Sequence, residues 1–408
     1  MLNKIYNKAE YLIKTSKLLN LEAYKEERQE LDGRHPAYDN KRHLAEAIDW
    51  LKRAQDATPD SGVARGYSVA WDPYFRRKGW QASYPETTGY IIPTFYECSK
   101  YLGDSELSER AEKMAKWEID IQMENGAVRG GTYNNEKPVA SIFCTGQVIF
   151  GWAHTYRETG NKDYLHAVKR AGDFLLSTQN GEGKLVEDPT YNFADKDSTV
   201  YHSRVAWSLV LLGKVSEEIK YTEAGIKNIE HALQHQDDNG WFRNNCLSDP
   251  GRPLLHTICY AMRGILESGI LLDDKKYINA AKLAADSLLE VTSRNSYIPG
   301  RLNNKWESDV KWSCVTGEAQ LAIIFLRLFQ ITQDERYLKG AGKLIKFVKT
   351  TQNCTANNPG IRGGIKGSYP ISGGYGTFQI LNWATKFFAD ALLIDNLINE
   401  KQAYISYG

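Results

Sequence analysis

Apolar positions recur at helical spacing in a series of segments along nearly the whole chain. In residues 162–179, for example, Tyr164, Val168, Ala171 and Leu175 fall on one face of a helix. The same pattern predicts further amphipathic helices at residues 42–55, 106–123, 221–236, 275–291 and 335–352. We interpret these six segments as the outer members of helical hairpins.

A second, more apolar helix accompanies each of them, and a small hydroxyl residue marks its predicted start. These residues recur every 54 to 61 positions: Thr88, Thr145, Ser203, Thr257, Thr316 and Thr377. Each is expected to N-cap its helix by accepting a bond from a backbone N–H of the first turn. The sixth helix should run from Thr377 to about Ile398, with residues 42–55 as its partner from the other end of the chain.

The period and the number of repeats together predict a closed ring. Repeats of 54 to 61 residues are too long for open solenoids of helix pairs, whose repeats span roughly 33 to 47 residues, and the series stops at six. The expected fold is all-α, an (α/α)6 toroid over residues 41–408 as one domain. Residues 1–40 are predicted to form a helix at 5–19 and a polar connector. Strand-like alternation is confined to short stretches such as residues 62–71.

Such a ring would create a binding face. If the apolar helices form the inner wall, their N-termini open onto one side of the molecule, where exposed N–H groups and partial positive charge accumulate. This arrangement favours a ligand that carries carboxylate, sulfate or phosphate.

Composition and charge narrow the partners. The formal net charge is +1, so the chain as a whole does not attract nucleic acid or membrane surfaces. No apolar run is long enough to span a membrane and the start has no signal-peptide core, which favours a cytoplasmic protein. None of the six cysteines has zinc-site spacing with another cysteine or a histidine. We therefore expect no metal and no cofactor.

Aligning the repeats on their hydroxyl residues picks out the candidate catalytic groups. Two of only eight histidines, His202 and His256, stand directly before a hydroxyl residue, and Tyr260 lies one helical turn after His256. Glu86 is an acid just ahead of the first inner helix. These four residues are our candidate general acids and bases. The alternatives are buried histidines bonded to backbone carbonyls, and a carboxylate that only stabilises a helix N-terminus.

Arg204 lies two residues after His202 and is the expected partner of a substrate carboxylate. It could instead pair with Asp195 or Asp197. Aromatic residues are abundant, with 24 Tyr and 10 Trp, and many precede the inner helices. Such rings stack on the C–H faces of sugars, and they also suit terpenoid pockets. The full set of candidate substrate-binding residues is Arg204, Tyr84, Tyr90, Tyr201, Gln147, Glu318, Asp309, Trp80 and Tyr375.

With its repeats placed, the chain resembles the alpha/alpha six-hairpin toroids over about residues 43–400. Within that group, the segments from Thr145-Gly-Gln147 to Asn161-Lys-Asp-Tyr-Leu165 and from Ser198 to Leu212 are similar to the helical region of D-glucuronyl C5-epimerases. No counterpart of the extra β-rich domains of that family is present. The resemblance implies an enzyme that acts on carbohydrate.

Several reactions remain open. Acid/base chemistry at a uronate, by an epimerase or a lyase acting on an acidic oligo- or polysaccharide in polysaccharide biosynthesis or remodelling, is the leading interpretation. A glycoside hydrolase would use paired carboxylates such as Glu86 with Asp309 or Glu318. A 2-epimerase of amino sugars would use the histidine pair. A non-catalytic glycan-binding toroid is a further alternative. A terpenoid cyclase or prenyltransferase-like toroid is disfavoured because the chain has no Asp-x-Asp-Asp run and no matching metal triad.

Overall fold

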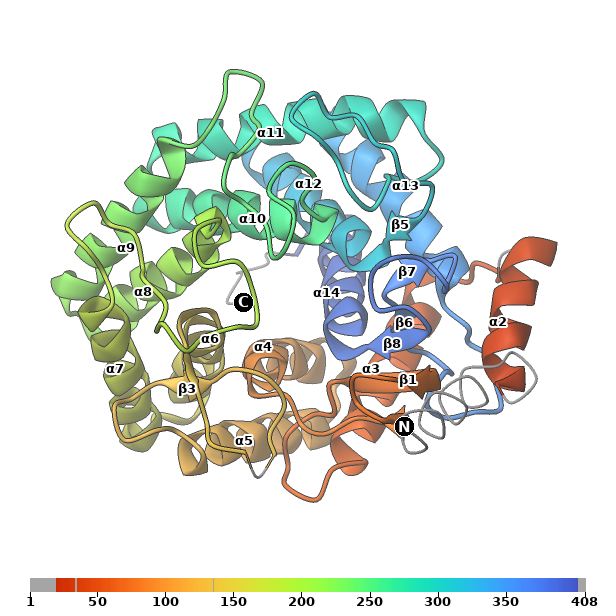
Figure 1. The fold of residues 1–408 in the computed structure, drawn as a ribbon, viewed down its shortest axis with the longest axis horizontal. Coiled ribbons are helices and arrows are strands. Elements are labelled where there is room, and N and C mark those ends of the chain that lie inside the picture. The colour runs from red at the N-terminus through yellow and green to blue at the C-terminus, as the bar shows by residue number, and fades with distance from the viewer. Residues whose placement is uncertain (1–19, 34, 135, 403–408) are drawn as a thin grey trace, which may run out of the picture.

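The computed structural model, which describes residues 20–33, 35–134 and 136–402, is a ring built from two concentric layers of helices (Figure 1). The inner helices are α4 (Pro85–Leu102), α6 (Ile142–Thr159), α8 (Ser203–Ser216), α10 (Leu255–Leu272), α12 (Val315–Thr332) and α14 (Asn382–Asn399). The outer helices are α3 (Asn40–Asp56), α5 (Ser105–Asp120), α7 (Lys162–Ser177), α9 (Ile219–Leu233), α11 (Lys275–Arg294) and α13 (Glu335–Thr351). The expected (α/α)6 toroid is confirmed.

The ring closes between the two ends of the chain. Each inner helix packs against the next, and α14 packs against both α4 and α3. The partner expected for the sixth inner helix is therefore confirmed. Consecutive inner helices are neighbours, so α4 and α10, three places apart in a ring of six, stand on opposite sides of the axis.

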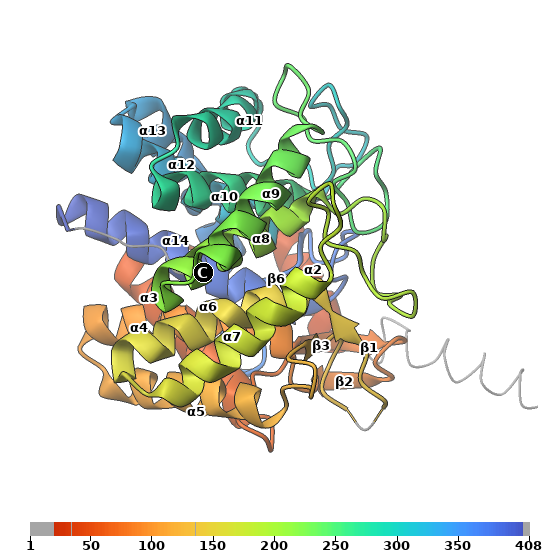
Figure 2. The ribbon, with the colours of Figure 1, turned by 90° about the vertical axis from the view of Figure 1, so that its left-hand side faces the viewer.

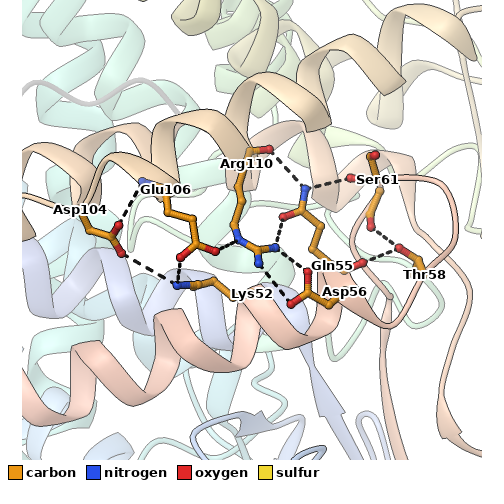
Figure 3. A network of polar contacts seen from close by, with 9 residues as sticks. Lys52, Gln55, Asp56, Thr58, Ser61, Asp104, Glu106 and Arg110 are labelled. Atoms are coloured by element: carbon orange, nitrogen blue, oxygen red, sulfur yellow. Dashed lines mark hydrogen bonds and ion pairs between the residues drawn. The ribbon is translucent and has the colours of Figure 1, made fainter.

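A glutamine beside the end of five outer helices ties each repeat to the next. Gln179 Nε2 donates to the carbonyl of Gly183, four residues later, and to that of Ala224 on the next outer helix. Gln55, Gln122, Gln236 and Gln352 make corresponding pairs of bonds. Figure 3 shows the example at Gln55, whose amide reaches Ser61 and Arg110. One bond of each pair satisfies a carbonyl in the loop after the outer helix, and the other reaches a carbonyl within the neighbouring outer helix.

In four of these five repeats the loop carbonyl belongs to a glycine of positive φ, and in the repeat of Gln55 it belongs to Ser61, with φ +70°. Gly183 has φ +86°, and a Cβ placed there would lie 2.3 Å from the carbonyl oxygen of Lys227. Glycine is needed because the loop must adopt a left-handed conformation while it touches the backbone of the next helix.

The hydroxyl residues mark the inner helices, but their expected capping role is wrong. Thr88 lies inside the first turn of α4, and the N-cap is Tyr84. The Thr88 hydroxyl donates to the Tyr84 carbonyl and accepts from the backbone N–H of Val63, both at 2.9 Å. Thr145 makes the equivalent two bonds in the next repeat. The hydroxyl therefore fixes the helix start to the segment that precedes it.

The sixth repeat also corrects the sequence alignment. Thr377 lies in a loop, where it donates to the Gly373 carbonyl, and α14 begins only at Asn382. The residue equivalent to Thr88 is Thr385, which bonds Leu381 and Ile365 in the same manner.

Short strands and long loops gather on one side of the ring (Figure 2). Strands β1 (Gly66–Asp72), β2 (Arg77–Trp80), β6 (Ile365–Lys366) and β8 (Gln379–Leu381) form an antiparallel sheet in the order β2-β1-β8-β6. Two further pairs join β3 (Val128–Arg129) to β4 (Ala140–Ser141) and β5 (Ser313–Cys314) to β7 (Ser368–Tyr369). The strand expected within residues 62–71 thus forms as β1.

The segment before the toroid contains more structure than expected. Residues predicted to be a polar connector include helix α2 (Leu21–Asp32), which lies against the outside of the ring (Figure 1). Its buried Glu30 pairs with buried Lys366 at 2.6 Å. A helix held by buried carboxylates reads as polar in sequence, so hydrophobic periodicity misses it. The helix expected at residues 5–19 lies outside the described residues. None of the described helices combines the length and apolarity that a membrane span requires.

Candidate active site

A cavity of about 230 Å³ lies on the strand-bearing side of the ring, at the N-terminal ends of inner helices. Eight of its thirteen lining residues are tyrosine, phenylalanine or tryptophan. The lining residues are Arg65, Tyr84, Glu86, Phe143, Tyr191, Phe193, Ala194, Tyr201, Leu247, His256, Tyr260, Tyr375 and Trp383. Among these, the ionisable groups other than tyrosine are Arg65, Glu86 and His256. The cavity therefore has aromatic walls around a small set of charged and polar groups, as carbohydrate sites do.

Glu86 is the single carboxylic acid that lines the cavity. The Tyr84 hydroxyl donates to its Oε2 at 2.6 Å, and the Cys144 thiol lies 3.6 Å from the same oxygen. Burial raises the pKa of Glu86, while the bonds from Tyr84 and Cys144 and the charge of Arg65 act in the opposite direction. These opposing effects suit a group that gains and loses a proton during turnover.

Arg65 provides the cationic group of the cavity. It lies just before β1, and its Nη1 donates to Gln81 and Gln379, both at 2.8 Å. The guanidinium packs against the Trp383 ring, with 4.7 Å between Cζ and the ring centroid. Its Nε and Nη2 make no hydrogen bond to any described residue. A fixed guanidinium with donors to spare is suited to bind a carboxylate.

His256, in the first turn of α10, enters the cavity as a neutral imidazole. Gln320 Nε2 donates to its Nδ1, so the ring carries its proton on Nε2. Burial, with a contribution from the Arg204 charge, lowers the pKa of His256 to about 3. The ring contacts those of Tyr260 and Tyr375, with centroids 4.3 and 5.5 Å away. His256 is thereby set up to donate a hydrogen bond to a bound ligand.

Of the predicted site residues, six line this one cavity: Glu86, His256, Tyr260, Tyr84, Tyr201 and Tyr375. Glu86 comes from α4 and Tyr260 from α10, so they approach from opposite sides of the ring. Burial raises the pKa of Tyr260, which therefore keeps its proton at neutral pH. The sequence thus identified groups that the fold brings together from distant repeats.

His202 does not line the cavity, in contrast to our prediction. It is 1% exposed and lies behind Tyr201 and Phe143, with its Nε2 3.8 Å from Glu187 Oε1. Burial lowers the pKa of His202 to about 3 and raises that of Glu187 to about 7. His202 is the residue directly before α8, at the end of the 3-10 helix η1 (Val200–His202), and the neighbouring Tyr201 lines the cavity in its place.

Arg204, Gln147 and Tyr90 are completely buried beneath the cavity floor. Arg204 Nε donates to Gln147 Oε1 at 2.7 Å, and its guanidinium lies between aromatic rings. Arg204 therefore cannot bind a ligand in the cavity directly. The arginine that lines the cavity is Arg65, which belongs to a loop that the alignment of helix starts did not cover.

Three further predicted residues have structural roles elsewhere. Trp80 packs on Trp50, with ring centroids 5.1 Å apart. Glu318 is buried and accepts from the backbone N–H of Ile298 and the hydroxyl of Ser313. Asp309 is an exposed partner of Arg252. Trp80, Glu318 and Asp309 are therefore not part of the cavity.

Seven lining residues were not predicted. Arg65, Tyr191, Phe193, Ala194 and Leu247 belong to segments between helices, where periodicity carries no information. Phe143 and Trp383 lie in the first turns of α6 and α14, and the misplaced start of α14 concealed Trp383.

One cluster at the other end of the inner helices has metal-ligand chemistry. Possible ligand atoms of Glu97, His154 and Glu158 lie within 4.8 Å of one another. Lys100 Nζ already contacts both carboxylates, at 3.5 and 2.6 Å. The ammonium group of Lys100 therefore already provides a positive charge to this cluster.

Comparisons with known proteins bear on the fold. No family model and no curated protein matches the chain. Among solved structures, a sugar epimerase from a ruminal bacterium is similar to this chain, with a TM-score of 0.68 and 14% sequence identity. The match covers 93% of this chain and 99% of the epimerase chain. The chain has the (α/α)6 toroid fold.

Two other structures show the same likeness. An unsaturated glucuronyl hydrolase specific for heparin has a TM-score of 0.67 and 16% identity, covering 88% of this chain and 98% of its own. Cellobiose 2-epimerase from Bacillus thermoamylovorans B4167 has a TM-score of 0.67 and 14% identity, and the match covers 91% of this chain and 98% of the epimerase chain. The expected resemblance to toroid carbohydrate enzymes is confirmed, and the particular likeness to D-glucuronyl C5-epimerases stays a prediction.

Proposed function

We propose that the protein is an enzyme that acts on a carbohydrate bearing a carboxylate and moves a proton at the carbon next to that carboxylate. One observation carries the proposal: a guanidinium, Arg65, and a carboxyl group of raised pKa, Glu86, line the same aromatic cavity. The carbohydrate class is supported by the fold, which sugar epimerases and a glucuronyl hydrolase share.

In this mechanism Arg65 binds the substrate carboxylate, and ionised Glu86 removes the proton from the adjacent carbon, C5 of a uronate. The electron pair of the broken C–H bond moves into the carboxylate, whose growing negative charge Arg65 stabilises. His256 donates a hydrogen bond to the substrate from its Nε2.

The outcome depends on where the next proton goes. If Tyr260 donates its phenolic proton to the opposite face of C5, the sugar is epimerised. If instead the electron pair expels the oxygen at C4, which then takes up a proton, a C4–C5 double bond forms and the chain is cleaved. The position of Tyr260 on α10, across the ring from α4, supports epimerisation.

Hydrolysis by paired carboxylates has less support. That mechanism needs two acids on either side of the glycosidic bond. Glu86 is the single acid among the residues that line this cavity, and the predicted partners Asp309 and Glu318 lie elsewhere.

The test is incubation with uronate-containing oligosaccharides in deuterated water. Epimerisation places deuterium at C5, detected by NMR. Elimination produces the ultraviolet absorbance of an unsaturated uronate, and hydrolysis produces new reducing ends without either change. We expect deuterium uptake, and we expect E86Q to abolish it.

Arg65→Gln should raise KM for uronates at least tenfold, because it removes the charge that binds the carboxylate. Arg77→Gln, at an exposed arginine on the neighbouring strand β2, is the matched control and should have no effect. Equal turnover of neutral and uronate sugars by wild-type protein and R65Q would refute the proposed substrate class. Binding without any of the three products would support the glycan-binding alternative.

A further inference from the structure

Arg204 is buried beneath the cavity floor with most of its hydrogen-bonding groups unused. Its side chain is 0% exposed, and Nε donates to Gln147 Oε1. Neither Nη1 nor Nη2 has a hydrogen-bond partner among the described residues, and the same holds for Gln147 Nε2. A guanidinium carries four N–H bonds on its two terminal nitrogens, and buried N–H groups are normally paired.

Aromatic rings surround the guanidinium without supplying acceptors. Arg204 Cζ lies 5.2 to 5.7 Å from the centroids of five rings, those of Tyr90, Phe150, Trp207, Tyr260 and Phe387. Their faces attract the cation, but they offer no lone pair in the direction of the N–H bonds. Trp207 Nε1, a further donor, is also buried without a partner.

The neighbouring charges leave this part of the core short of negative charge. Buried Lys386 pairs with Asp390 at 2.7 Å, and buried Arg263 has Glu267 at 3.7 Å, which also binds Arg327. Among the described side chains of this cluster there are four basic groups and two carboxylates: Arg204, Arg263, Arg327, Lys386, Glu267 and Asp390.

The pKa shifts show which of these groups stays charged. Burial, together with the charge of Arg263, lowers the pKa of Arg204 only to about 10, so Arg204 stays charged at neutral pH. Burial also lowers the pKa of Lys386, to about 7, although Asp390 opposes that shift. The charge of Arg204 also acts on the Glu86 carboxyl, whose pKa it lowers. The unpaired donors therefore belong to a guanidinium that is buried and charged.

We propose that a small inorganic anion, with chloride as the physiological candidate, is bound in the core of the toroid by Arg204 Nη1 and Nη2 and by Gln147 Nε2. Because Gln147 Oε1 accepts from Arg204 Nε, its amide nitrogen lies beside the guanidinium and can bind the same ion. A halide accepts several N–H bonds without directional demands.

Anion binding would fix the floor of the cavity above it. Arg204 lies 5.2 Å from the centroid of Tyr260, which lines the cavity, and 5.7 Å from that of Tyr90. The bound ion would hold Arg204, and thereby both rings, in place. This site is independent of the reaction proposed above, because its occupancy can be measured without any substrate.

The experiment measures the denaturant midpoint of the full chain in sodium chloride and in sodium methanesulfonate at equal ionic strength, since methanesulfonate is a much larger anion than chloride. Above the dissociation constant, each tenfold rise in chloride should raise the folded-to-unfolded ratio about tenfold relative to methanesulfonate. Crystals soaked in bromide should show an anomalous peak within hydrogen-bond distance of Arg204.

Arg204→Met should remove the chloride dependence, and Arg294→Gln, at an exposed arginine, should leave it intact. If R204M does not fold, Gln147→Leu, which deletes one proposed ligand, should at least weaken the dependence. Equal midpoints in both salts with no bromide peak would show that water occupies the site. A chloride response that R204M and Q147L leave unchanged would place the ion elsewhere. Either result overturns the proposal.

Discussion

At the scale of single residues, Glu86 depends on its neighbours for its chemistry. A carboxyl group in an aromatic cavity would by burial alone remain protonated, and it could then not act as a base. The Tyr84 hydroxyl, the Cys144 thiol and the Arg65 charge each favour the ionised form. Together with burial, these three residues therefore influence the pH at which Glu86 ionises.

Tyr84→Phe should move the acidic limb of the kcat/KM profile to higher pH. The variant lacks the O–H donor that stabilises ionised Glu86, so the pKa of this carboxyl rises further above its ordinary value. The profile is measured on the uronate substrate identified by deuterium exchange. Tyr191→Phe is the control, because Tyr191 lines the same cavity without bonding Glu86. A limb that stays in place, or moves to lower pH, would contradict this role of Tyr84.

The sequence revealed those site residues that belong to helix starts. Glu86, His256 and Tyr260 lie in the first two turns of the inner helices α4 and α10. Arg65 was not predicted because a loop residue before a short strand has no periodic signal. His202 directly precedes a hydroxyl residue, as His256 does, but it belongs to the 3-10 helix before α8, which repeat spacing does not reveal.

At the scale of elements, the glutamines beside the outer helix ends join successive repeats. The helices themselves were predictable because an apolar face at a spacing of 3.6 residues survives in any sequence that packs them. The start of α14 could not be predicted in this way, because strand β8 lies between Thr377 and the helix and lengthens this repeat. The glutamine pattern was visible in the sequence, but its purpose was not, because its acceptors are backbone atoms of another repeat.

Gln236→Ala should destabilise the protein by about 1–3 kcal/mol, because it removes the donor to the Gly240 carbonyl and the bond that reaches Ala280 on the next outer helix. Urea denaturation measures the change. Gln234→Ala, at an exposed glutamine two residues earlier, removes a side chain of the same size without those bonds and should cost less than about 0.5 kcal/mol. Equal effects of the two variants would show that the bonds contribute nothing to stability.

At the scale of the whole molecule, both ends of the chain are needed to complete the ring. Helix α14 packs against α12, α4 and α3, so α3, from the beginning of the chain, serves as its outer partner. Trp50 of α3 is completely buried and donates to the Gly360 carbonyl. Folding of the first and last hairpins is therefore coupled through contacts more than 300 residues apart in sequence.

A chain that starts at residue 57, and so lacks α3, should show no cooperative thermal transition, because the apolar face of α14 is then exposed. A chain that starts at Asp39 keeps α3 and its N-cap. It should still unfold cooperatively, at a lower midpoint, since Lys366 has lost Glu30. Circular dichroism during heating distinguishes the two. Cooperative unfolding of the shorter chain would show that an open ring is stable.

The bonds made by the threonines and glutamines have a consequence for how this architecture diverges. Each of these side chains forms hydrogen bonds with a main-chain carbonyl or N–H, and every residue except proline has both groups. Evolution can thus replace nearly all the surrounding side chains while the wall keeps its shape. The sugar epimerase of 14% identity, for example, matches this fold over 93% of this chain and 99% of its own, so the shape is shared where the sequences have little in common.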